Sequence, residues 1–196
     1  MPSAVSSKKI FQFKIILKYT QPKIWRRIEV PEEFTFWELH SAIQDCMGWS
    51  GMHPHNFKAL NPRTGRKDVI GKENEDLDII CEKNTKIADY FLSPQDKASY
   101  LYDFGDKWDH RILLESIEPA IIGREYPQCI AGKQACPPDD CGGVWGYQEL
   151  LEIRANPNHE DYEERMEWLG EEFDPDEFDP KSVEFDHPDN AWEFGI

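Results

Sequence analysis

Ionisable side chains gather in the stretch YLYDFGDKWDH, residues 100–110. Carboxylates and imidazoles bind divalent metals and act as general acids and bases, so the stretch is a candidate catalytic or metal site. The triplet Asp-Phe-Gly within it also holds magnesium in protein kinases. A kinase needs a glycine-rich phosphate loop, a strand lysine with a helix glutamate and an HRD-type catalytic loop as well, and the sequence has none of these. The kinase interpretation therefore fails, and four candidate catalytic residues remain: Asp103, Asp106, Asp109 and His110.

The same stretch has the pattern of a β-hairpin. Two β-prone runs flank Gly-Asp at 105–106, a pair favoured in two-residue hairpin turns. We predict a hairpin at residues 100–115 in which Asp103 lies opposite Trp108. This register makes Asp103 and His110 diagonal neighbours on one face, within reach of a hydrogen bond. They would either satisfy each other as a buried polar pair or serve as an acid/base pair or half of a metal site.

Two further histidines, His53 and His55, are separated by a proline. On a regular strand, residues two apart point to the same side and can chelate one ion. The proline equally favours an irregular stretch with one ring exposed. If the sheet brings these rings beside Asp103 and His110, the four side chains form a mononuclear metal site.

The five cysteines are an odd number in a chain without an export signal, which favours free thiols or metal binding over a disulfide framework. Cys46 and Cys81 lie in apolar segments and are expected to be small buried hydrophobes. The other three occupy a loop dense in Pro and Gly. Free thiols and a redox pair are open alternatives there, since the spacing is not that of a CxxC zinc knuckle. A structural zinc site would use Cys129, Cys136, Cys141 and His159.

The remaining pattern predicts strands before helices, hence an α+β fold with a mixed or antiparallel sheet. Strands are expected at 11–20, 24–30, 55–60 and about 78–81, and loops at 61–76 and 126–147. A helix at about 35–47 has Thr35 as N-cap and Glu38 completing a capping box, and it ends at Gly48. Two helices at 147–155 and 159–170, the second capped by Asn158, form a C-terminal pair.

The expected organisation is a disordered leader at residues 1–9 and a single domain at 10–196. That domain divides into a sheet-rich part at 10–120, a Cys/Pro/Gly loop at 126–146 and an acidic helical part at 147–196. The acidic tail contains regularly placed aromatic residues, so we expect it to pack along the surface.

The net charge of −16 is unevenly distributed. Residues 1–28 contain seven Lys or Arg and no acid, whereas residues 159–196 contain fifteen Asp or Glu against two cations. This argues against nucleic-acid binding. The acidic end is either a solvated face that keeps the protein in solution, or a surface that meets a basic partner or the chain's own N-terminal strand. No apolar run is long enough for a membrane span and no secretory signal is evident, so we expect a cytoplasmic protein.

An ordered series of motifs resembles the Ri-plasmid ORF-three-like family, some of whose members are labelled transposon-passenger or TnpR-like proteins. The series comprises FQFKIILKYTQPKIWRRIEVP, TFWELHSAIQDCMGW, HPHNF, YLYDFGDKWDHRILLE, ACPPDDCGGVWGYQELL, NPNHEDYEERMEWLG and FDPDEFD. The resemblance implies an α+β fold and no secure reaction. A resolvase needs a nucleophilic serine in an arginine-rich pocket and a basic helix-turn-helix, neither of which is present.

We therefore predict a binding or interaction domain associated with mobile elements or accessory genes, rather than an enzyme. The alternative is a metal-dependent hydrolase that uses His53, His55, Asp103 and His110. Zinc or another divalent metal is the cofactor that either metal hypothesis requires.

Overall fold

The computed structural model describes residues 5–73, 78–170 and 173–186, which contain one mixed sheet and helices, an α+β fold as predicted. The strands are β1 (Val5–Leu17), β2 (Trp25–Pro31), β3 (His55–Leu60), β4 (Lys67–Gly71), β5 (Ile80–Cys81), β6 (Lys97–Tyr102), β7 (Trp108–Ile121) and β8 (Gln128–Lys133). The helices are α1 (Phe36–Met47), α2 (Gly143–Arg154) and α3 (Tyr162–Leu169), with 3-10 turns η1 (Glu82–Asn84), η2 (Ile87–Asp89) and η3 (Pro180–Ser182).

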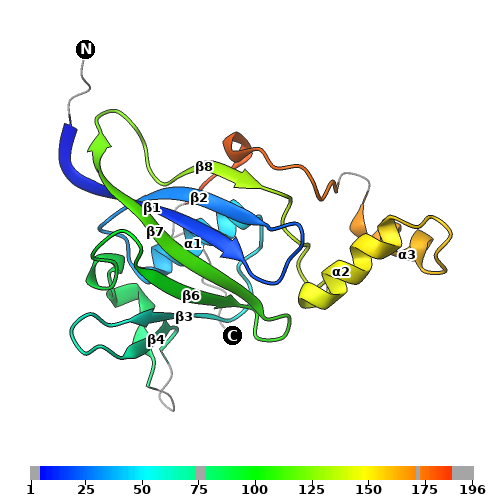
Figure 1. The fold of residues 1–196 in the computed structure, drawn as a ribbon, viewed down its shortest axis with the longest axis horizontal. Helices are drawn as coiled ribbons and strands as arrows, with labels where there is room; N and C mark the ends of the chain where they lie inside the picture. The colour runs from blue at the N-terminus through cyan, green and yellow to red at the C-terminus, as the bar shows by residue number, and fades with distance from the viewer. Residues whose placement is uncertain (1–4, 74–77, 171–172, 187–196) are drawn as a thin grey trace.

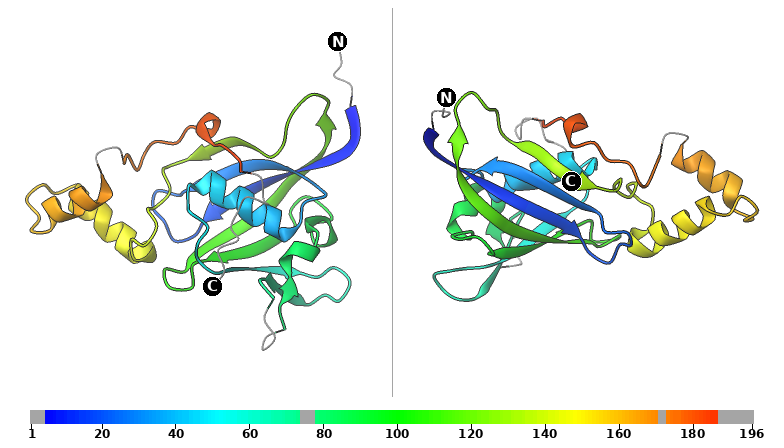
Figure 2. Two further views of the ribbon diagram at one scale, coloured as in Figure 1. Left: turned by 180° about the vertical axis from the view of Figure 1, so that it is seen from behind. Right: turned by 45° about the horizontal axis from the view of Figure 1, so that its top comes forward.

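The sheet of these described residues has eight strands in the order β5-β4-β3-β6-β7-β1-β2-β8. The β4–β5 pair is parallel and the other pairs are antiparallel. Helix α1 lies across one face of the sheet (Figures 1 and 2). The core fills the space between them, where Phe36, Leu39 and Ile43 of α1 meet inward residues of the strands such as Phe13 and Ile15. Period-two alternation along β1 and β2 places these apolar side chains on one face.

Helix α1 begins and ends as predicted. The Thr35 hydroxyl accepts a hydrogen bond from the Glu38 backbone N–H at 3.2 Å, and the Glu38 carboxylate accepts one from the Thr35 backbone N–H at 2.6 Å. Gly48 closes the helix in the left-handed conformation, with φ +84°. The capping box satisfies two of the N–H groups that a helix start leaves without intrahelical partners.

Ion pairs cover the other face of the sheet. Lys18 contacts Asp109 at 2.9 Å, and Arg27 donates to Glu115 from Nη2 at 3.0 Å. The hydrogen bonds from Arg27 hold the pKa of the Glu115 carboxyl below its usual value. In the described part of the chain, the N-terminal cations pair with Asp109 and Glu115 of β7 and with Glu32 and Glu33 of the turn after β2. No ion pair of the described residues joins these cations to the segment 173–186.

Three predicted boundaries are wrong. Residues 67–71 of the expected loop form β4, which continues the sheet beside β3. Residues 128–133 of the cysteine-containing loop form β8, which pairs with β2 and supplies the edge of the sheet. Residues 5–9 of the expected disordered leader belong to β1, and residues 1–4 lie outside the described residues.

The hairpin of β6 and β7 exists, but its predicted register is wrong by one residue. Tyr102, not Asp103, lies opposite Trp108, and a five-residue loop at 103–107 replaces the two-residue turn. Asp103 and Lys107 adopt positive φ angles of +55° and +60°, and the Lys107 N–H bonds to the Asp103 carbonyl at 2.7 Å. Because a one-residue slip exchanges the faces of a strand, Tyr100 and Tyr102 are buried beside Trp108, opposite to the prediction.

The C-terminal part contains the predicted helical pair and packed tail. Helices α2 and α3 lie together at one end of the molecule and project from the sheet (Figure 1). Helix α2 begins at Gly143, earlier than predicted, and the N-cap of α3 is Asp161 rather than Asn158. The segment 173–186 runs back over β8, and Phe173, Val183 and Phe185 pack against the core. Residues 187–196 of the predicted tail lie outside the described residues.

A candidate metal centre at the junction of three loops

Three loops meet at one end of α1 and the β6–β7 hairpin: residues 48–54, 103–107 and 134–142. The Trp49 indole donates to the Pro137 carbonyl at 2.9 Å. The Ser50 backbone N–H and hydroxyl both donate to one Asp139 carboxylate oxygen, at 3.1 and 3.0 Å. The Asp103 N–H donates to the Pro54 carbonyl at 2.9 Å. These hydrogen bonds connect segments that are far apart in the sequence.

The start of α2 fixes the third loop against the hairpin. The Gly142 N–H donates to the Asp106 carboxylate at 3.2 Å. Gly143, with φ +69°, lies so close to the Asp106 backbone carbonyl that a β-carbon would strike it. Only glycine adopts this conformation without strain and permits this approach. Asp106, predicted as a catalytic candidate, thus serves to dock α2 onto the loop.

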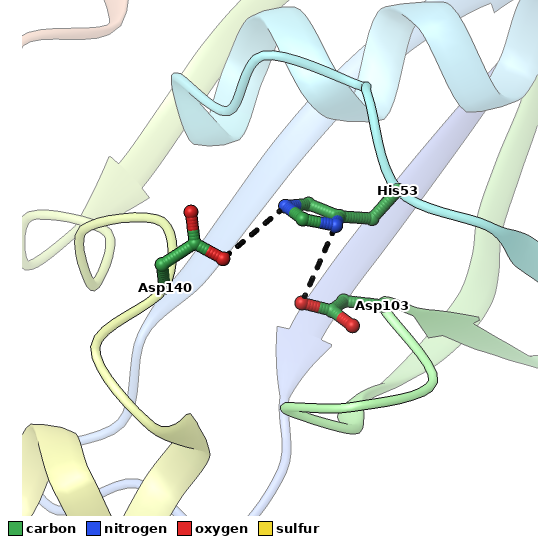
Figure 3. Close-up of side chains that lie close together, drawn as sticks. All are labelled: His53, Asp103 and Asp140. Carbon is green, nitrogen blue, oxygen red and sulfur yellow. Dashed lines mark ion pairs between the residues drawn. The ribbon is translucent and has the colours of Figure 1, made fainter.

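His53, Asp103 and Asp140 converge where these loops meet (Figure 3). The imidazole lies between the carboxylates, with Nδ1 3.8 Å from Asp103 Oδ2 and Nε2 3.5 Å from Asp140 Oδ1. One ligand atom from each residue lies within 4.8 Å of the other two. The Asp103 side chain is 11% exposed, His53 is 28% exposed and Asp140 is 74% exposed, so the cluster opens to solvent on the Asp140 side.

The charged side chains of this cluster are two carboxylates beside one imidazole. Within residues 5–73, 78–170 and 173–186, no Lys or Arg forms an ion pair with Asp103 or Asp140. Beneath the imidazole lies Tyr102, whose ring centroid is 5.8 Å from that of His53. Burial raises the pKa of Tyr102 to about 12, so its hydroxyl stays neutral at physiological pH. Two carboxylates that have no Lys or Arg partner, and only one imidazole between them, form a site that attracts a cation.

The donor set suits a divalent metal ion. Zinc bonds to imidazole nitrogen and carboxylate oxygen measure about 2.0 to 2.2 Å, which at tetrahedral angles separates ligand atoms by about 3.4 Å. A single ion uses one nitrogen of His53, whereas in this structure each ring nitrogen faces a different carboxylate, so the side chains would have to turn to bind one ion together. Three protein ligands leave at least one coordination position for water or a ligand, as in catalytic rather than structural zinc sites.

Of the predicted four-residue metal cluster, only His53 and Asp103 come together. His55 bonds through Nε2 to the Glu82 carboxylate at 2.7 Å, and its ring stacks on that of His40. His40 in turn shares a 2.7 Å hydrogen bond with the Tyr100 hydroxyl. His55 therefore belongs to a buried polar network under α1, outside the three-loop junction.

His110 lies in the core rather than at the site. It is fully buried, its Nδ1 lies 3.3 Å from the Tyr100 carbonyl, and its Nε2 has no hydrogen-bond partner among the described residues. Burial lowers its pKa to about 3. No hydrogen bond or ion pair joins it to Asp103 in the described part of the chain, so the predicted Asp–His pair is wrong. Asp109 faces the opposite side of the sheet, in its ion pair with Lys18.

The predicted cysteine site does not assemble either. Among the described residues, no three ligand atoms of Cys129, Cys136, Cys141 and His159 lie within 4.8 Å of one another. Cys129 is on β8, Cys136 and Cys141 are in the loop before α2, and His159 is beyond α2, where its Nδ1 accepts from the Asp161 N–H at 3.2 Å. All five cysteines are free thiols.

Asp140 is the functional candidate that the sequence did not reveal. It follows two prolines and another aspartate in a loop far along the chain, and nothing local distinguishes it. Its φ of +58°, rare for a residue other than glycine, is visible only in the structure. A separate cavity of about 230 Å³ lies between the turn before β2, α2 and the segment 173–186, and its lining contains none of the predicted site residues.

The fold and its motifs define a member of a known family. The family model described as plasmid pRiA4b ORF-3-like protein matches residues 9–182, and the chain belongs to that family. The chain is 35% identical over 161 residues to the uncharacterized protein y4hQ of Sinorhizobium fredii, covering 82% of this chain and 81% of the relative. The crystal structure of the protein of unknown function MM3350 from Methanosarcina mazei Go1 is similar, with a TM-score of 0.87 and 48% identity, covering 91% of this chain and 99% of that one.

No helix of the described residues is long and apolar enough to cross a membrane.

Proposed function

We propose that this protein is a metal-binding domain whose ion is held by His53, Asp103 and Asp140. The observation that carries the proposal is the convergence of these three side chains, from three separate loops, with one ligand atom of each within 4.8 Å of the others. Apart from the His53 imidazole, neither carboxylate has an ion-pair partner among the described residues, and the lack of a Lys or Arg there supports the proposal.

The ligand types narrow the choice of metal. One imidazole nitrogen and two carboxylate oxygens suit Zn²⁺, Mn²⁺ or Fe²⁺ better than soft Cu⁺, which prefers sulfur ligands. The ion would connect residues 48–54, 103–107 and 134–142, and would present its open coordination position on the solvent side of Asp140. A partner or small ligand with an oxygen or nitrogen donor would complete the coordination. A metal-binding domain differs from the expectation drawn from the sequence, in which the hydrolase alternative is the one that uses a metal at His53 and Asp103.

The first test is metal content. The protein is equilibrated with zinc or manganese, passed through a desalting column and measured by elemental analysis. The proposal expects one ion per chain, lost in His53→Ala and retained in His159→Ala. His159 is the histidine of the predicted cysteine site, so the second variant separates the two metal hypotheses. Metal retained by His53→Ala, or absent from the wild-type protein, contradicts the proposal.

A metal-dependent hydrolase is the second candidate, and the open coordination position favours it. A metal lowers the pKa of a bound water and turns that water into a nucleophile. The test is turnover of bis(p-nitrophenyl) phosphate and p-nitrophenyl acetate by the metal-loaded protein. Hydrolysis that Asp140→Asn abolishes would support an enzyme. One bound ion without such turnover would favour the binding domain.

A further inference from the structure

The cavity between the turn before β2, helix α2 and the segment 173–186 has a largely apolar floor. Its volume is about 230 Å³. Ile24 and Tyr147, which line it, are 1% and 5% exposed, and Leu151 beside them is half-buried. Pockets that hold drug-sized ligands measure roughly 300 to 1,000 Å³, so this one suits a smaller molecule with an apolar body. None of the three metal-site residues lines it.

The segment 173–186 supplies one wall of the cavity and is fixed there by hydrogen bonds (Figure 1). Gln134 Nε2 donates to the Pro175 carbonyl at 3.1 Å and to an Asp176 carboxylate oxygen at 2.5 Å. The Ala135 N–H donates to the same Pro175 carbonyl at 3.0 Å. Gln134 is 3% exposed, so water does not compete freely for its amide. These contacts hold Pro175 and Asp176 in place at the cavity.

Two exposed side chains of opposite charge also line the cavity. Arg154 of α2 makes one long hydrogen bond, from Nη2 to the Phe173 carbonyl at 3.4 Å. The Asp176 carboxylate accepts from the neutral amide of Gln134. Among the described residues, no ion pair neutralises Arg154 or Asp176, and the two do not pair with each other. Both charges are therefore free to meet a ligand.

Tyr147 adds an uncharged polar group to the same lining. Its side chain is buried, yet its hydroxyl makes no hydrogen bond with any residue in the described part of the chain. Burial raises the pKa of Tyr147, so the hydroxyl keeps its proton at physiological pH. A phenol hydroxyl both donates and accepts, and a polar atom of a ligand in the cavity would give it a partner.

We propose that this cavity binds a small aliphatic α-amino acid. The carboxylate of the ligand binds the Arg154 guanidinium, and its ammonium group binds the Asp176 carboxylate. Its apolar side chain packs against Ile24 and Leu151. A ligand with a single charge would leave one of the two charged side chains without a partner, and Asp176 would repel a multiply charged anion such as a phosphate ester. A zwitterion with an apolar side chain matches all of these groups.

The first experiment is calorimetric titration of the full chain with leucine, isoleucine, valine and methionine. At least one of them should bind at one site per chain, with a dissociation constant of about 1 mM or less. The tightest binder is then compared with its two singly charged analogues, which for leucine are 4-methylpentanoate and 3-methylbutylamine. Each analogue should bind about tenfold more weakly, because one charged contact is lost. Absence of binding by all four amino acids, or equal binding by either analogue, would overturn the proposal.

The second experiment changes the two charges separately. Arg154→Gln and Asp176→Asn should each weaken binding about tenfold. Asp176→Asn keeps an oxygen that can accept from Gln134, so the wall of the cavity should persist. The matched controls are Arg165→Gln and Glu177→Gln, which remove exposed charges that do not line the cavity and should leave the affinity unchanged. Wild-type affinity in either cavity variant, with the variant folded, would overturn the assignment of a zwitterion.

Two further variants separate this site from its surroundings. Tyr147→Phe keeps the ring and removes the hydroxyl, and should weaken binding about fivefold. Tyr162→Phe is the control, because Tyr162 on α3 does not line the cavity. His53→Ala should bind the amino acid as the wild type does, since the proposed metal centre is a different site. Loss of amino-acid binding in folded His53→Ala would contradict the assignment to this cavity, whether or not the protein binds metal.

Discussion

The imidazole rings of His40 and His55 stack face to face, with their centroids 3.5 Å apart and their planes within 5°. His40 is on α1 and His55 is on β3, so the stack joins the helix to the sheet. The Tyr100 hydroxyl contacts His40 on one side and the Glu82 carboxylate contacts His55 on the other. Because two protonated rings at this spacing would repel each other, the docking of α1 depends on a neutral His40.

The buried histidines predict a loss of stability in mild acid. Burial, and then the charge of His55, lower the pKa of His40 well below 6.5, and burial lowers the pKa of His110 to about 3. The unfolded chain therefore binds protons below pH 6.5 that the folded chain does not bind. As the pH drops from 6.5 to 5, the free energy of unfolding should fall with increasing steepness, and the slope for each histidine should approach about 1.4 kcal/mol per pH unit near pH 5. Urea unfolding at closely spaced pH values measures this slope.

Two variants show which histidines are responsible. His110→Gln removes one titrating group, so the slope between pH 6.5 and 5 should be roughly halved. His159→Ala, which removes a half-buried imidazole in the loop before α3, is the variant against which this change of slope is compared. An unchanged slope in His110→Gln, with the variant folded, would show that His110 is protonated in the folded protein.

The capping box of α1 predicts a difference between two substitutions at one position. Thr35→Ala removes the hydroxyl that accepts from the Glu38 N–H, and should lower the free energy of unfolding by about 1 kcal/mol. Thr35→Ser keeps the hydroxyl and should cost much less. Chemical denaturation of both variants tests this, and equal losses would mean that the lost methyl group, not the cap, accounts for the effect.

The contact between Gly143 and Asp106 predicts that the start of α2 tolerates no side chain. Gly143→Ala combines a left-handed backbone with a collision against the Asp106 carbonyl, and should cost about 3 kcal/mol or more. Gly123→Ala is the matched control, because Gly123 has φ +83° and no atom within 4 Å of its added β-carbon. It should cost only the conformational strain, about 1 to 2 kcal/mol. Thermal or urea unfolding compares the two, and equal losses would argue against the tight contact.

Local signals explain which parts of the fold the sequence predicts. Helix α1 was predicted from cap to cap because Thr35, Glu38 and Gly48 act on neighbouring residues. Strand β8 has no such signal, since it lies between prolines and forms by pairing with β2. The predicted register of the β6–β7 hairpin rested on a two-residue turn at Gly105-Asp106. The structure has a longer loop there, which makes hydrogen bonds to Pro54 and to the start of α2.

Only those residues of the candidate site that have a local signal in the sequence were predicted. His53 and Asp103 were recognisable by residue type and by their neighbours in the sequence. Asp140 was not, because it joins them only through the docking of a distant loop by Ser50 and Trp49. His55 and His110 were wrongly grouped with them, because the sequence does not show that β3 and β7 direct these rings into the interior.

The most direct test of the metal centre is calorimetric titration of the metal-free protein with Zn²⁺ and with Mn²⁺. Asp140→Asn keeps the size of the side chain, and asparagine tolerates the left-handed backbone at this position, so the fold should persist. Asp161→Asn is the matched control on the exposed α3 cap. The account predicts one site per chain in the wild type, an affinity at least tenfold weaker in Asp140→Asn, and wild-type affinity in Asp161→Asn. Wild-type affinity in Asp140→Asn would contradict it.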